Sequence, residues 1–138
     1  MSQPVQFPFF PVPGPGGASF PMPYVPVLLR LGTRVESVTA LIDSGAAVSV
    51  LPYDVGIRLG ADWNALTVRL SLTGNLAAQP AKALAVELVV SSLPAVPMVF
   101  AWSLDPNVPV ILGQLWFFDA FDIRFCRSRN TIEIEPRP

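Results

Sequence analysis

The sequence predicts an all-β domain with one short helix. Apolar residues recur at every second position over several short stretches, which is the period of a half-buried strand. Gly, Pro, Asn, Asp and Ser separate these stretches, as expected of tight connections between strands. The chain has 138 residues, of which 51% are hydrophobic and 14% charged. That composition provides ample material for the core of one ordinary domain, with enough apolar surface left over to favour a subunit interface.

The first half of the domain is expected to begin with a hairpin of two apolar strands, 27–31 and 35–42, joined by a tight turn at 32–34. A third strand, 48–51, is closed by Pro52, since proline lacks the amide that would continue the ladder. A helical turn or short helix is expected at 53–59. Alternation of Val68, Leu70 and Leu72 with polar residues then predicts a half-buried strand at 68–72.

The second half of the domain is also expected to consist of short strands joined by turns. Strands are predicted where every second residue is apolar or, at 110–112, where a short run is fully apolar. Residues 114–120 are the best candidate for a helix, because bulky apolar side chains would cover most of its circumference. In chain order the expected elements are strands at 84–90, 97–102 and 110–112, the helix at 114–120, and strands at 121–126 and 131–135.

Residues 1–26 differ in composition from the predicted domain at 27–138. They contain eight of the sixteen prolines, three glycines and no charged residue. Proline fixes φ and removes backbone donors, so an extended or polyproline conformation is favoured over a core element. This proline-rich N-terminal arm is interpreted as a tail or spacer, a peptide-docking arm, or a pro-segment that the mature domain removes.

Several classes of function are excluded by composition. The chain has no histidine and a single cysteine, Cys126, so zinc or iron sites of the usual kind, histidine-dependent triads and an internal disulfide are not possible. We expect no metal and no cofactor. The net charge is −1 without a basic block, which argues against nucleic-acid and membrane partners.

The N-terminus lacks the basic start and continuous apolar run of a secretion signal. The most apolar window, 83–102, contains Glu87, two prolines and a Ser-Ser pair, which suits two strands and a turn better than a membrane helix. A cytoplasmic location is therefore expected.

Asp43 is the strongest candidate for a catalytic residue. It follows an apolar strand, stands in the turn Asp43-Ser44-Gly45-Ala46, and is followed by a second apolar strand. Desolvating a carboxylate between two buried strands is unfavourable unless the group is paired or functional. Without histidine, catalysis must depend on carboxylates, hydroxyls, Lys82 or the one thiol, and this restriction also favours Asp43.

The segment around Asp43 and a second segment downstream together resemble the retropepsin family of aspartic proteases, the single-domain retroviral-type enzymes and their cellular relatives. That family has an apolar-apolar-Asp-Thr/Ser-Gly-Ala turn, then a hydroxyl and an apolar residue, then a flap hairpin, then apolar-apolar-Gly before a helix. Here the matching residues are Ile42, Asp43, Ser44, Gly45, Ala46, Ser49, Leu51, Ile111, Leu112 and Gly113. The resemblance covers roughly Val27 to Glu135.

The resemblance implies a retropepsin-like barrel and an endopeptidase that uses two carboxylates sharing one proton. It also implies that Ser44 bonds across a twofold axis, that Gly45 keeps the turn tight, and that Ala46 leaves room for substrate backbone. The chain carries one such motif, since Asp119 and Asp122 lie outside any Asp-Ser/Thr-Gly context. The second Asp43 must then come from a second chain, which implies a symmetric homodimer acting on a peptide or protein substrate.

Three further residues are weaker candidates. Thr73-Gly74-Asn75 falls where the family has its flap, the hairpin that closes over substrate, but an ordinary hairpin turn is the alternative.

Two other functions also stay open for the whole chain. One is a retropepsin-fold module for dimerisation or peptide binding that has lost catalysis, and the other is an unrelated β-barrel interaction domain.

Overall fold

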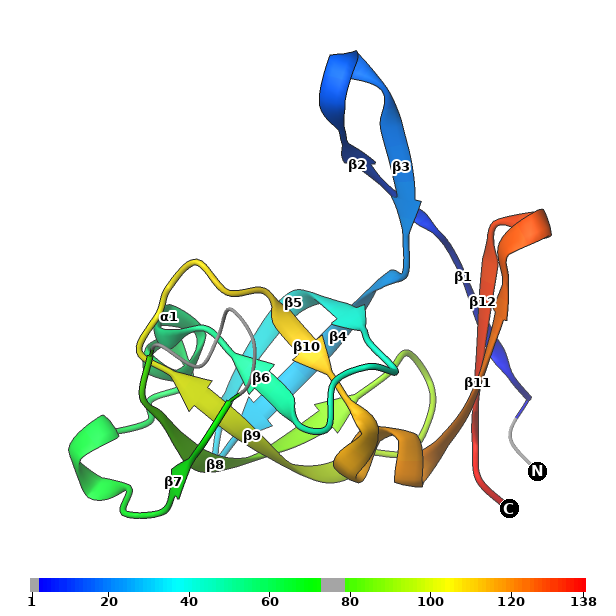
Figure 1. Ribbon diagram of the computed structural model, residues 1–138. Coiled ribbons are helices and arrows are strands. Elements are labelled where there is room, and N and C mark those ends of the chain that lie inside the picture. Colours follow the sequence, from blue (N-terminus) through cyan, green and yellow to red (C-terminus); the bar gives the residue numbers. More distant parts are fainter. Residues whose placement is uncertain (1–2, 73–78) are drawn as a thin grey trace.

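The computed structural model describes residues 3–72 and 79–138, in which strands form a barrel, a three-stranded sheet built from both ends of the chain, and a hairpin (Figure 1). Six strands follow one another around the barrel, and the first pairs with the last to close it. In order of pairing they are β4 (Tyr24–Leu31), β5 (Arg34–Ile42), β10 (Val110–Leu112), β6 (Ser49–Leu51), β9 (Val96–Ser103) and β8 (Ala81–Val89). The short β7 (Arg69–Leu70) pairs with the outer edge of β8.

The all-β prediction is confirmed, and most predicted strands differ from the observed ones by three residues or fewer at either end. β4 begins at Tyr24 instead of at residue 27, because Tyr24 to Pro26 already pair with β5. The predicted strand at 68–72 is shorter than expected, since only Arg69 and Leu70 join the ladder as β7. The helix α1 (Tyr53–Arg58) lies at its predicted position.

Helix α1 is fixed to the barrel by an aromatic cluster. The Trp102 side chain of β9 is fully buried, and its Nε1 donates to the Tyr53 carbonyl at 3.0 Å. The Tyr53 ring stacks on Trp102 with centroids 5.6 Å apart, and Trp63 meets Trp102 edge-on at 5.3 Å. Gly56 permits this packing, because a Cβ there would lie 2.1 Å from the Trp102 ring.

The proline-rich N-terminus forms ordered strands, which its composition did not predict. β1 (Val5–Pro8) pairs antiparallel with β12 (Thr131–Pro136), which also pairs with β11 (Phe121–Cys126). Phe7 packs against the main core. Pro8 is tolerated because β1 is an edge strand, with one neighbour in its sheet. The chain then forms β2 (Phe10–Pro13), a turn at Pro15–Gly17 and β3 (Ser19–Met22), a hairpin that projects away from the barrel (Figure 1).

The predicted helix at 114–120 is not a regular α-helix. Gln114–Phe118 form a π-type turn in which Leu115 is extended and Trp116 has a φ of 73°. The Trp116 amide donates to Asp119 Oδ2 at 3.0 Å, and this bond holds the unusual backbone. Phe117 is fully buried whereas Leu115 and Trp116 are exposed, so the turn directs one aromatic ring inward and two apolar side chains outward. Within the described residues no helix is long and apolar enough to span a membrane.

Candidate active site

Asp43 lies at the start of the turn that connects two strands of the barrel. It directly follows β5, and the turn 44–48 returns the chain to β6. Strand β10 occupies the space between these two, parallel to β5 with Leu112 opposite Ile42, and antiparallel to β6 with Ile111 opposite Val50. The apolar segment before Gly113 is therefore the structural partner of the Asp43 turn.

Backbone and side-chain hydrogen bonds fix the Asp43 turn. The Asp43 amide donates to the Leu112 carbonyl at 3.0 Å, which ties the turn to β10. The Gly45 amide donates to Asp43 Oδ1 at 2.9 Å, and the Ala46 amide donates to the Asp43 carbonyl at 3.2 Å. The carboxylate is thus oriented by its own turn, half-buried, while Ser44 and Gly45 are exposed.

Ser49 and Gly113 fix the other end of the same turn, where it leads into β6. Ser49 is completely buried, and its Oγ accepts a hydrogen bond from the Gly113 amide at 3.0 Å. A Cβ at Gly113 would lie 2.6 Å from the Val48 carbonyl oxygen and 2.7 Å from that of Ala46. Glycine is required here because the backbone of the turn crosses directly over this position.

Gln114 contributes a contact that the sequence did not reveal. Its Nε2 donates to the Ser44 carbonyl at 2.6 Å, and its amide donates to the Ala46 carbonyl at 2.8 Å. Both ends of this residue therefore hold the Asp43 turn from the β10 side. The only hint in the sequence is its position directly after Ile111-Leu112-Gly113, because an exposed glutamine is not otherwise informative.

We expect Gln114→Met to loosen the turn without unfolding the barrel. Methionine has a similar length but no donor, so the Ser44 carbonyl loses its partner at a net loss of about 1 kcal/mol. Hydrogen exchange at the Gly45 and Ala46 amides should accelerate. Gln79→Met, at an exposed position of the described chain, is the matched control and should leave these amides unchanged. Equal exchange in both variants would contradict a role for Gln114 in holding the turn.

A groove of about 270 Å³ opens beside Asp43. Among the described residues its other lining is apolar or small, with Ser71 the one further polar side chain, and comprises Gly45, Ala46, Ala47, Val48, Val50, Ser71, Leu72 and Ile111. Such a surface suits apolar side chains of a ligand, with a single acid placed among them. The predicted flap residues Thr73, Gly74 and Asn75 lie outside the described residues.

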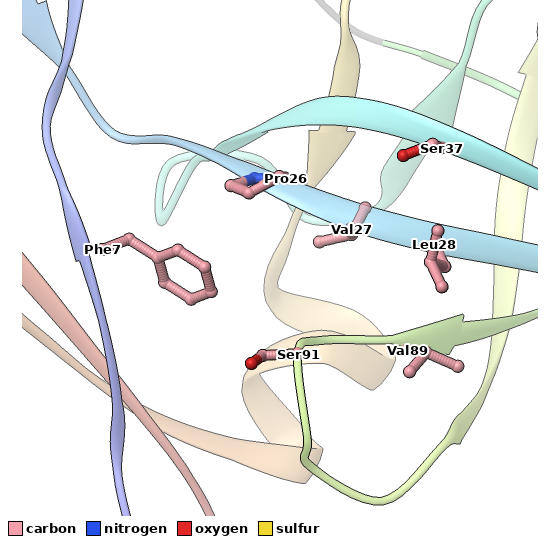
Figure 2. A pocket seen from close by; sticks show the side chains of 7 residues that line it. All are labelled: Phe7, Pro26, Val27, Leu28, Ser37, Val89 and Ser91. Carbon is pink, nitrogen blue, oxygen red and sulfur yellow. The ribbon is translucent and has the colours of Figure 1, made fainter.

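A second pocket, of about 260 Å³, lies between β1 and the barrel. Phe7 faces Pro26 and Val27 across it, with Leu28, Ser37, Val89 and Ser91 completing the lining (Figure 2). None of these side chains is ionisable in the ordinary pH range, so the pocket lacks the chemistry that Asp43 gives to the groove.

The comparison with solved structures agrees with this topology. The crystal structure of a retropepsin-like aspartic protease from Rickettsia conorii matches with a TM-score of 0.62 at 15% sequence identity, over 97% of this chain and 96% of that chain. The chain has the retropepsin-like fold. No protein-family model matches the sequence, and no curated protein does. The expected all-β, retropepsin-like barrel with one short helix is confirmed, with β10 of this fold supporting the Asp43 turn.

Proposed function

We propose that the protein is an aspartic endopeptidase that acts as a symmetric homodimer. The observation that carries this proposal is the setting of Asp43. Its carboxylate is oriented by the Gly45 amide and stands at the wall of an apolar groove, within a retropepsin-like fold. One carboxylate per chain is half of the machinery that this chemistry needs, so the second copy supplies the other half.

In the proposed mechanism the two Asp43 carboxylates lie about 3 Å apart and share one proton. The ionised one removes a proton from a water molecule, whose oxygen attacks the carbonyl carbon of the scissile bond. The protonated one donates its proton to the carbonyl oxygen, which gives a neutral tetrahedral diol. The carboxylate that took the water proton then gives it to the peptide nitrogen, while the other carboxylate takes a proton from one diol hydroxyl. The C–N bond breaks, which leaves a carboxylic acid and an amine, and the two carboxylates again share one proton.

The proposed substrate is an extended peptide segment with apolar or aromatic residues beside the cleaved bond. An extended peptide can bind through main-chain hydrogen bonds, which leaves its side chains to select the sequence. Ala46, Val48, Val50 and Ile111 offer this substrate an apolar wall without a charge other than Asp43. We assign Thr73, Gly74 and Asn75 to the flap that closes over it and excludes water.

Asp43→Asn tests the proposal directly. Asparagine retains an Oδ1 that accepts from the Gly45 amide, so the turn is preserved while the acid is removed. Cleavage of an apolar peptide library at acidic pH should fall by about 10²–10⁴-fold. Asp122→Asn, at an exposed position on β11, is the matched control and should retain full activity.

Two further outcomes distinguish the proposed enzyme from its alternatives. Cleavage that survives in Asp43→Asn would assign the activity to another group or to a contaminant. A wild-type protein that binds the peptides but never cleaves them would be a catalytically silent binding module.

A further inference from the structure

The β2–β3 hairpin, residues 10–22, is a specific structure and not an irregular tail. Its two strands pair from Phe10 opposite Met22 to Pro13 opposite Ser19. The Gly14 amide donates to the Ala18 carbonyl at 2.7 Å and closes the tip. The Phe20 ring covers Gly14 so closely that a Cβ there would lie 1.9 Å from the ring. The sequence is therefore adapted to keep this hairpin folded.

The surface of the hairpin is uncharged and strongly apolar. Residues 10–22 contain no Asp, Glu, Lys or Arg, and Phe10 and Phe20 are 51% and 50% exposed. A two-stranded hairpin on its own is at best marginally stable in water, because it has no second layer to cover its apolar face. Exposed aromatic side chains on such an element are typical of a surface that another protein covers.

The base of the hairpin lies beside the candidate active site. The Ile42 amide donates to the Pro23 carbonyl at 3.0 Å, and Tyr24 pairs with Leu41 on β5. The Phe10 ring contacts Tyr24 edge-on with centroids 6.3 Å apart. Ile42 directly precedes Asp43, so the base of the hairpin lies next to the candidate site. From there the hairpin projects away from the barrel (Figure 1).

We infer that the β2–β3 hairpin is an arm that clasps the second copy of this chain. The inference rests on the proposed function, which requires the two Asp43 carboxylates to lie within about 3 Å of each other. Any arrangement that meets this condition brings the second copy against the residues next to Ile42, where the arm begins. Four residues per strand, at about 3.3 Å each, let the arm reach about 13 Å over the partner's surface.

The experiment compares dimer dissociation in variants of the full-length protein, all carrying Asp43→Asn so that no chain is cleaved. Phe10→Ser with Phe20→Ser should raise the dissociation constant about tenfold or more by sedimentation velocity, since aromatic anchors dominate such interfaces. Val35→Ser is the matched control, because Val35 is 53% exposed at the opposite end of β5, and it should leave dimerisation unchanged. Added salt should have little effect, because the arm carries no charge.

Hydrogen exchange supplies a measurement that does not depend on the variants. Amides of residues 10–22 should be protected in the Asp43→Asn dimer and exchange faster on dilution to monomer. The proposed role of the arm is overturned if the double-serine variant dimerises as tightly as its parent, or if residues 10–22 exchange equally fast at both concentrations. Either result leaves the protease proposal intact. A mature active protein that lacks residues 10–22 by intact mass does the same. A parent that stays monomeric at every concentration overturns both proposals.

Discussion

Mixing wild-type protein with an excess of the Asp43→Asn variant should inhibit peptide cleavage far beyond simple dilution. If each active site takes one Asp43 from each of two chains, a mixed dimer contains a single acid and is inactive. With about a ninefold excess of variant, random exchange of protomers leaves only about one tenth of wild-type chains paired with another wild-type chain. Activity per wild-type chain should therefore fall about tenfold after the mixture has equilibrated.

The same excess of Asp122→Asn is the control for this mixing experiment. That variant keeps its Asp43, so mixed dimers remain active, and the measured rate should rise with the total protein. Activity proportional to wild-type protein alone, whatever the excess of Asp43→Asn, would show that one chain carries a complete site. Asp119 would then be a poor candidate for the second acid, because its Oδ2 already accepts a hydrogen bond from the Trp116 amide.

Most of the barrel was predictable because its strands are marked by local patterns. Alternation and short apolar runs mark the strands from β4 to β12, and Gly, Pro and polar residues mark the connections between them. The partnership of the Asp43 turn with the segment ending at Gly113 was also predictable, but only from the resemblance to a family. Nothing local in the sequence of β10 indicates that it lies between β5 and β6.

The parts that sequence reasoning missed depend on long-range contacts or on backbone details. The proline-rich composition of the N-terminus gives no indication of β1, because the position of this strand is set by pairing with β12 at the other end of the chain. The turn at Gln114–Phe118 has the apolar content of a helix, but burial of Phe117 and the hydrogen bond to Asp119 favour a π-type turn instead. Gln114 is recognisable as part of the site only once Ser44 lies beside it.

Gly113→Ala should damage stability and activity together. The added methyl group would lie 2.6 Å and 2.7 Å from the carbonyl oxygens of Val48 and Ala46, and both are backbone atoms that cannot rotate away. Either β10 or the turn must move, and overpacking of this kind typically destabilises a protein by about 1–3 kcal/mol. The movement also acts on Asp43, because its amide bonds to Leu112 and the turn bonds to Gln114.

A displacement of about 1 Å at a catalytic group can reduce the rate about 100-fold, so the loss of activity should exceed what the loss of folded protein explains. Urea unfolding and peptide cleavage, measured on the same preparation, separate the two effects. Gly32→Ala is the matched control: Gly32 has a φ of 61° with open space around its Cβ position, far from Asp43 at the β4–β5 turn. It should lose stability by about 1 kcal/mol and keep its activity. If Gly113→Ala behaves like Gly32→Ala, the close crossing of β10 and the Asp43 turn does not position the carboxylate.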